Sequence, residues 1–198
     1  MRLACLVANV GNIVFVYILY DYARLFEYFS YWALQLTALF MTLALLANSC
    51  GYGVKALHHI LFEMTFTMNL VVVCVYWSTL HEQSLGECVN DWEVINTYLT
   101  HSIPFISTAL NFCVSDHVLR ASHFKMLCVI GVVYGYVNYL KVLERGEPLY
   151  WFLTWEDMTS VYIMGGLIVA FSVVFVQISA CMHVIKPRST STDHYKRL

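Results

Sequence analysis

Six long apolar segments account for almost the whole chain and limit what it can fold into. Crossing the hydrocarbon core of a bilayer, about 30 Å thick, takes roughly 20 apolar residues in an α-helix. The segments of this kind run over residues 3–22, 30–53, 55–80, 94–115, 123–143 and 159–185. Composition agrees, because only 12% of the 198 residues are charged, against about 25% in soluble domains. The sequence therefore predicts an all-α integral membrane bundle of six transmembrane helices with short loops.

The domain organisation follows from the same pattern. The six spans and their short connections fill residues 1–185, which leaves no room for a soluble domain. Only the last segment, "KPRSTSTDHYKRL" at residues 186–198, is continuously polar. We expect one six-span transmembrane domain over residues 1–185 and a polar C-terminal tail over residues 186–198.

The basic residues of the connections predict which way the bundle crosses the membrane. With six spans, both termini share a side, here side A, with the connections after the second and fourth spans; the other side is side B. Side A has Arg2, Lys55, Arg120, Lys125, Lys186, Arg188, Lys196 and Arg197, and side B has Arg24, Lys141 and Arg145. The positive-inside rule then places both termini in the cytoplasm, or in the matrix if the membrane is mitochondrial. Side B is rich in acids, so we expect no nucleic acid as a partner. Because the spans lie in a bilayer, we expect membrane lipids as partners.

The cysteine and histidine patterns do not predict a metal or cofactor site. The seven cysteines are mostly in or beside spans, and no two are spaced as C-x-x-C. Several histidines fall near side A, but none has the spacing of a zinc finger or a metalloprotease. His59 and Glu63 are spaced i, i+4 in the third span, which allows a buried His–Glu pair.

A polar stripe runs along the fourth span. Its members recur at steps of four, three, four and three residues, which places them on one helical face, and they are Thr97, His101, Pro104, Thr108 and Asn111. Polar groups are costly in lipid, so this face is expected to point into the bundle. Two interpretations remain open for His101. It makes a packing hydrogen bond between helices, or it acts as a base.

A base of this kind needs a hydroxyl nucleophile at a similar depth. Ser30 meets this condition, because the second span begins on side B, where the near end of the fourth span also lies. Thr37, one heptad deeper on the same helix, is the competitor. If His101 acts as a base, Ser30 and His101 are the candidate catalytic pair, and Thr37 is the alternative nucleophile. The residues expected to contact a bound molecule are Thr37, Thr97, Thr108 and Asn111.

The aromatic connection "EPLYWFLTWED" between the last two spans allows two interpretations. Trp and Tyr gather at membrane interfaces and form a belt there. The same segment can also lie over the mouth of the bundle, as a lid above Ser30 and His101.

Several segments, in their order and spacing, resemble a known group of membrane proteins. They are "YFSYWALQL", "LFEMTFTMNLVVVCVYW", "THSIPFISTALNFCVS", "SHFKMLCVIGVVYGYVNYL" and "PLYWFLTW". With these, the chain resembles the rolling stone family, within the larger group of androgen-induced membrane hydrolases. The resemblance covers the second to sixth spans.

The resemblance implies a function and two site residues. In the hydrolase branch, an intramembrane threonine and a histidine cleave fatty acid esters of hydroxy fatty acids. Ser30 takes the place of that threonine, His101 matches the histidine, and Asn111 stands where related sequences carry an acid. The rolling stone branch is associated with cell fusion. The expected function is thus hydrolysis of a membrane lipid ester without a cofactor. The alternative is a non-catalytic accessory or structural subunit of a larger membrane complex, for example in the mitochondrial inner membrane, with other membrane-protein subunits as partners.

Overall fold

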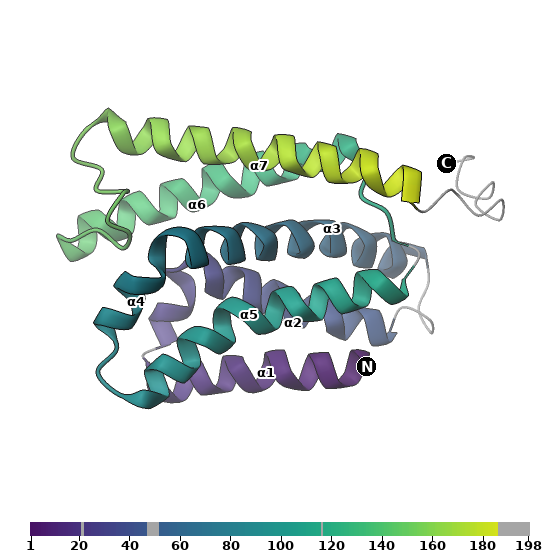
Figure 1. The fold of residues 1–198 in the computed structure, drawn as a ribbon, viewed down its shortest axis with the longest axis horizontal. Helices are drawn as coiled ribbons and strands as arrows, with labels where there is room; N and C mark the ends of the chain where they lie inside the picture. The colour runs from purple at the N-terminus through teal and green to yellow at the C-terminus, as the bar shows by residue number, and fades with distance from the viewer. Residues whose placement is uncertain (21, 47–51, 116, 186–198) are drawn as a thin grey trace.

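The protein is an all-α bundle in the computed structural model, which describes residues 1–198 except 21, 47–51, 116 and 186–198 (Figure 1). The predicted tail at 186–198 lies outside the described residues. The six long helices are α1 (Arg2–Leu19), α2 (Phe29–Leu46), α3 (Tyr52–Val75), α5 (Asp91–Val114), α6 (Phe124–Arg145) and α7 (Met158–Ile185). The short elements are η1 (Tyr22–Phe26), η2 (Tyr76–Leu80), α4 (His81–Glu87) and η3 (Ala121–His123). The described part contains no strand.

The apolarity of the helices confirms the expected class. Within the described residues, five helical segments are long and apolar enough to cross a membrane; they contain α1, α2, α3 with α4, α6 and α7. The sixth long helix, α5, falls outside this group because polar side chains are spread along it. The beginning of α1 and the end of α7 lie at the same end of the bundle (Figure 1).

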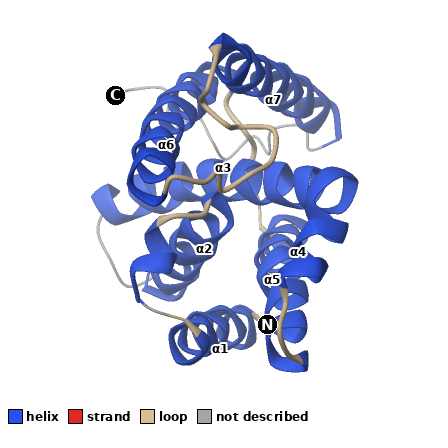
Figure 2. Ribbon diagram, turned by 90° about the vertical axis from the view of Figure 1, so that its left-hand side faces the viewer, coloured by secondary structure: helices blue, strands red, loops and turns tan. Residues whose placement is uncertain are grey.

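The helices form two groups (Figure 2). One group consists of α1, α2, α3 and α5, which pack against one another. The other is the hairpin of α6 and α7, which packs mainly on itself and meets the first group along α3. The cavity described below lies between these two groups.

Polar contacts join the helices of the first group. Asn9 of α1 donates to Ser107 Oγ of α5 at 2.9 Å, and Asn69 of α3 donates to Thr37 Oγ1 of α2 at 2.8 Å. Both contacts are buried. Side-chain hydrogen bonds of this kind connect helices inside a membrane, where the hydrophobic effect does not drive helix association.

A small-residue motif joins the hairpin. The segment "GVVYG" at residues 131–135 places Gly131 and Gly135 one helical turn apart on the side of α6 that faces α7. A Cβ added at Gly131 would lie 2.6 Å from Ile168 Cγ1, and one at Gly135 would lie 3.2 Å from Met164 Cγ. Glycines let two membrane helices approach closely, as in G-x-x-x-G motifs.

Several helix ends differ from the sequence expectation. The helix α1 ends at Leu19 and not at residue 22, and residues 52–53, expected at the end of the second span, belong to α3. Local geometry explains two other differences. The third helix does not end at residue 80, because it passes through the π-helical turn η2 and continues as α4 to Glu87. The helix α5 begins at Asp91 and not at residue 94, because Asn90 caps it. Asn90 Oδ1 accepts from the Glu93 N–H at 3.1 Å, and the Glu93 carboxylate accepts from the Val89 N–H at 2.9 Å. This reciprocal arrangement resembles a capping box.

Candidate functional site

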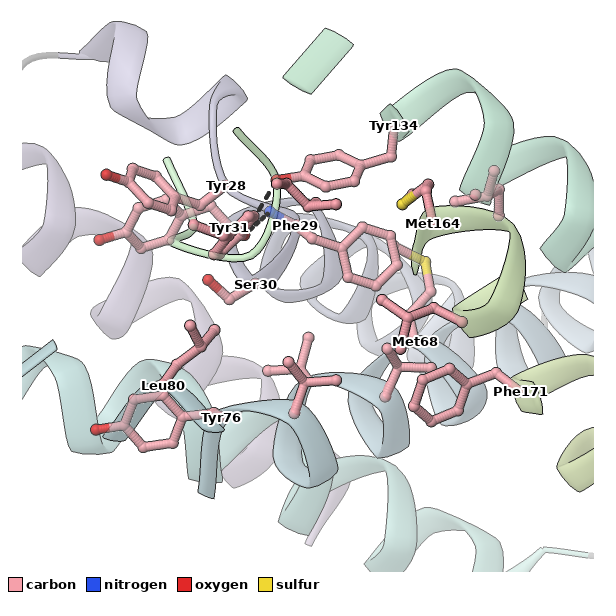
Figure 3. Close-up of a pocket in the computed structure, with 18 of the residues that line it drawn as sticks. Tyr28, Phe29, Ser30, Tyr31, Met68, Tyr76, Leu80, Tyr134, Met164 and Phe171 are labelled. Atoms are coloured by element: carbon pink, nitrogen blue, oxygen red, sulfur yellow. Dashed lines mark hydrogen bonds between the residues drawn. The ribbon is translucent and has the colours of Figure 1, made fainter. Parts of the chain in front are cut away.

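A cavity of about 170 Å³ lies between the four-helix group and the hairpin (Figure 3). Both groups contribute to its wall, so it is bounded by side chains from α2, α3, α6 and α7. The wall is mostly apolar and includes Phe29, Met68, Val72, Ile130, Ile168 and Phe171. Apolar pockets with a few polar groups are the usual form of small-molecule sites.

The cavity is polar at one end and apolar at the other. The hydroxyls of Tyr28, Ser30 and Tyr31 lie at the left in Figure 3, near the beginning of α2. Met164 and Phe171 lie at the opposite end. A molecule that matches this wall has a polar group at one end and hydrocarbon along the rest.

Ser30 is the second residue of α2 and lines the cavity. Its side chain is 8% exposed, and its Oγ makes no hydrogen bond with any residue that the structure describes. Its place in the first turn puts it beside the positive end of the helix dipole. The neighbouring N–H groups already have acceptors, which are the Tyr150 hydroxyl for Phe29 and the Tyr28 carbonyl for Tyr31 and Trp32.

His101 reaches the same cavity from α5. Its Nδ1 lies 2.7 Å from the Thr97 carbonyl oxygen. A carbonyl oxygen only accepts, so Nδ1 carries the proton and Nε2 keeps its lone pair. The ring also stacks on Tyr76, with ring centroids 3.7 Å apart and planes 10° apart. The imidazole is therefore held in one tautomer and one plane, with Nε2 available as an acceptor.

The structure brings Ser30 and His101 to one cavity but not into direct contact. No hydrogen bond joins their side chains in the described part of the chain. Catalytic hydrogen bonds are often long or absent before substrate binds. A nucleophile and base at these positions would have to close the gap when substrate is bound.

The other four candidate residues lie in helix contacts, outside the cavity wall. Thr37 Oγ1 donates to the Ala33 carbonyl at 2.7 Å, and Thr108 Oγ1 donates to the Pro104 carbonyl at 3.0 Å. The side chains of Thr37 and Thr108 are fully buried. Both bonds lie within one helix, and the contact that joins two helices here is the one from Asn69 to Thr37 Oγ1.

Thr97 and Asn111 have different partners from those expected of a binding site. The Thr97 carbonyl holds His101, whereas its hydroxyl lies 3.9 Å from Cys88 Sγ. Asn111 Oδ1 accepts from Arg2 Nε at 3.0 Å. Asn111 thus ties α5 to the start of α1, and the carbonyl of Thr97 orients the imidazole.

The aromatic connection before α7 forms part of the cavity wall. Tyr150, Phe152 and Leu153 all line it, whereas Trp151 is 57% exposed. Three residues of this segment therefore occupy the covering position expected of a lid, and Trp151 faces outward as a residue of an interfacial belt would.

Tyr150 joins this connection to the start of α2. Its hydroxyl accepts from the Phe29 N–H at 3.3 Å and from the Tyr134 hydroxyl at 3.0 Å. Burial raises the pKa of Tyr150 to about 12, so its hydroxyl stays uncharged at neutral pH.

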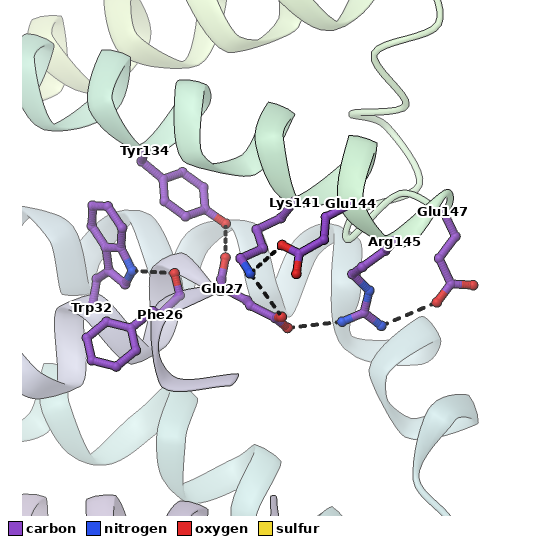
Figure 4. A network of polar contacts seen from close by, with 8 residues as sticks. All are labelled: Phe26, Glu27, Trp32, Tyr134, Lys141, Glu144, Arg145 and Glu147. Atoms are coloured by element: carbon purple, nitrogen blue, oxygen red, sulfur yellow. Dashed lines mark hydrogen bonds and ion pairs between the residues drawn. The ribbon is translucent and has the colours of Figure 1, made fainter. Parts of the chain in front are cut away.

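Ion pairs hold the side B end of α6 against the turn before α2 (Figure 4). Glu27 pairs with Arg145 at 3.0 Å and with Lys141 at 3.9 Å. Lys141 also contacts Glu144 at 2.7 Å, and Arg145 contacts Glu147 at 3.3 Å. These contacts close the hairpin onto the four-helix group at the polar end of the cavity.

A second polar cluster surrounds Glu63 at the side A end. His59 Nε2 lies 3.6 Å from the Glu63 carboxylate, as the i, i+4 spacing allowed. His123 Nδ1 pairs with the same carboxylate, which also accepts from the Arg120 N–H at 2.5 Å. His59 Nδ1 lies 3.3 Å from His117 Nδ1. Among the described residues, no group of His, Cys, Asp and Glu has the geometry of a metal site.

Sequence reasoning did not select most of the cavity wall, and two of the residues it missed have distinctive chemistry. Tyr76 lies in the π-helical turn and stacks on His101; π-helical turns inside helices are frequent at functional sites. Arg24 of η1 also lines the cavity. The sequence offers one indication of Arg24, because it is the single basic residue of the aromatic segment "YDYARLFEYFSYW".

Comparisons of the chain with protein-family models, with curated proteins and with solved structures found no match. The resemblance of the sequence segments to the rolling stone family therefore stays a prediction. The chemistry of the cavity is the basis for a functional conclusion.

Proposed function

We propose that this protein is an intramembrane hydrolase of a lipid ester, with Ser30 as nucleophile and His101 as base. The observation that supports this most directly is that both residues border one apolar cavity. They come from different helices and lie 71 positions apart in the chain.

The reaction follows from these two side chains. His101 Nε2 takes the proton of Ser30 as Oγ attacks the ester carbonyl carbon, and the tetrahedral intermediate carries the negative charge on the former carbonyl oxygen. Collapse of the intermediate breaks the ester bond, and the imidazolium returns the proton to the leaving alcohol. Water then releases the acid by the same two steps.

Two neighbouring groups favour this chemistry. The Thr97 carbonyl accepts from Nδ1, which is the orienting role that a carboxylate has in other triads. The first turn of α2 places the positive end of the helix dipole beside Ser30, where negative charge develops.

The wider setting is part of the proposal. The lipid enters sideways from the bilayer, and both termini face the cytoplasm, or the matrix in a mitochondrial membrane. The segments that resemble the androgen-induced hydrolases support the ester substrate. The distribution of Lys and Arg between the two sides supports the orientation.

Turnover of lipid esters by the purified protein tests the proposal. We expect Ser30→Ala and His101→Ala each to reduce turnover by about a thousandfold or more, because nucleophile and base act as a unit. Ser102→Ala is the matched control, since it removes a hydroxyl beside His101 that does not line the cavity. Its turnover should match the wild type. Full turnover in both cavity variants would refute the mechanism.

A different result would favour the accessory-subunit alternative. In that case the purified wild type would hydrolyse no ester, and the protein would co-migrate with other subunits in a gentle detergent extract. A free protein with ester turnover contradicts this alternative.

A further inference from the structure

Arg24 is a cation at the cavity, and none of the acids that the structure describes pairs with it. It lies in η1 and lines the cavity near the start of α2. Its Nε atom is buried and has no hydrogen-bond partner. Among the described residues, no carboxylate lies within ion-pair distance of its guanidinium. The residue as a whole is half-buried, so its guanidinium still has donors to offer to an anion.

The other basic residues of side B show the contrast. Lys141 and Arg145 both pair with Glu27, and each has a second carboxylate partner. Acids are thus available at this end of the bundle, but none of the described ones pairs with Arg24.

Aromatic rings hold the Arg24 guanidinium in place. Its Cζ lies 4.4 Å from the ring centroid of Tyr20 and 5.3 Å from that of Tyr28. Cation–π contacts of this kind stabilise a guanidinium but leave its N–H donors without acceptors. The side chain is therefore positioned and still able to bind an anion.

The rest of the cavity suits hydrocarbon. The wall includes Met68 of α3 and Tyr76 of η2, which are eight residues apart along a continuous helix. This separation is about 12 Å at a rise of roughly 1.5 Å per residue. Over this length the lining comes from Val, Ile, Leu, Met and Phe side chains. One acyl chain fits such a wall, whereas a bulky headgroup would meet no polar partner there.

We infer that the cavity binds a single-chain amphiphile whose anionic head, a carboxylate or a phosphate, pairs with Arg24. Arginine is suited to both anions because its planar guanidinium donates two parallel hydrogen bonds. The inference deepens the proposed function. It rests on that function only where it takes the bound amphiphile to be the acid part of a substrate or a product. Binding itself does not require hydrolysis.

Equilibrium binding to the purified full chain in an uncharged detergent tests the inference. The probes are oleate, lysophosphatidic acid and the uncharged monoolein. We expect the wild type to bind at least one anionic probe at least tenfold more tightly than monoolein. Arg24→Gln should abolish this preference. It should lower the affinity for the anionic probe about tenfold or more and leave the affinity for monoolein unchanged.

Two further variants keep the test decisive. Lys55→Gln removes one positive charge from an exposed position on α3, far along the helix from the cavity, so it should leave the preference intact. Arg24→Lys keeps the charge and loses the paired donors, so it should retain part of the preference even if Arg24→Gln does not fold. The more tightly bound of oleate and lysophosphatidic acid identifies the carboxylate or the phosphate as the natural head.

The outcomes separate this inference from the proposed hydrolysis. An anion preference that depends on Arg24 supports the inference, even in a protein that hydrolyses no ester. Equal affinity for charged and uncharged probes, or equal weakening of both by Arg24→Gln, would overturn it. Turnover that survives Arg24→Gln without any change in KM for an acidic lipid ester would also contradict it.

Discussion

Glu63 and Arg24 are two charged side chains at opposite ends of one bundle, and their surroundings differ. Glu63 is 2% exposed and has three partners, His59, His123 and the Arg120 N–H. Arg24 has ring contacts but no anion among the described residues. Glu63 lines only a small pocket of about 10 Å³, whereas Arg24 lines the cavity of about 170 Å³.

This difference separates a structural charge from a binding charge. A buried charge with all its partners in the fold gives the protein internal connections, and removing it leaves those partners without acceptors. A charge that the fold leaves unpaired beside a cavity contributes little to stability. It becomes useful when a ligand supplies the counter-charge.

The largest expected effect is on stability at the Glu63 cluster. We expect Glu63→Ala to lower the free energy of unfolding by about 3 kcal/mol, because it leaves the part-buried Arg120 N–H and two histidines without their acceptor. Arg24→Gln, which removes the charge at the other end, should change stability by less than about 0.5 kcal/mol. Thermal unfolding in the same detergent measures both. A larger loss at Arg24 than at Glu63 would reverse the comparison.

The next effect concerns the wall that the cavity shares with the hairpin. Gly131→Ala places a Cβ 2.6 Å from Ile168 Cγ1, and Ile168 lines the cavity. We expect a loss of about 1–3 kcal/mol from overpacking, together with weaker amphiphile binding. Gly166→Ala is the control, because nothing lies within 4 Å of its added Cβ. An effect of Gly166→Ala equal to that of Gly131→Ala would show that the contact with Ile168 is not the cause.

A smaller effect is expected at the connection that covers the cavity. Tyr150→Phe removes the acceptor of the Phe29 N–H and should cost about 0.5–1.5 kcal/mol. The pKa of Tyr150 is about 12, raised by burial from 10.0. The unfolded chain therefore releases this proton first, and the contribution of Tyr150 to stability is complete below pH 10 and is lost as the pH rises towards 12. Unfolding at pH 8 and pH 11 should show a smaller alkaline loss in Tyr150→Phe, and an unchanged loss would contradict this assignment.

The smallest effect is expected from the ion pairs of Glu27. Glu27→Gln should cost up to about 1 kcal/mol, because its partners Lys141 and Arg145 are partly exposed. The cost should shrink in high salt. If the loss of stability in Glu27→Gln does not depend on salt, the Glu27 ion pairs behave like the buried Glu63 cluster and not like exposed ion pairs.

The sequence predicted the class of fold well for a physical reason. Lipid requires long apolar helices, so the spans are visible as runs of apolar residues. The helix ends were less accurate, because a π-helical turn at Tyr76 and a cap at Asn90 depend on local geometry. Neither the π-helical turn nor the cap can be predicted from the positions of apolar residues.

The site was predictable in part. Depth and residue type selected Ser30 and His101, and both line the cavity. The periodicity that selected Thr37 and Thr108 identifies an inward face, but it does not say whether a cavity or another helix covers that face. Sequence reasoning did not select Arg24 as a residue of the cavity. Only the folded chain shows that none of the described acids pairs with its guanidinium.

The split of the helices into two groups has a consequence for the lipid itself. Because the wall belongs partly to the hairpin of α6 and α7, the cavity forms only when the hairpin docks on α3. A molecule that binds the docked state alone shifts the docking equilibrium by mass action, by RT ln(1 + [L]/Kd). The amphiphile then acts as a component of assembly, and the composition of the surrounding bilayer sets how firmly the last two helices are held.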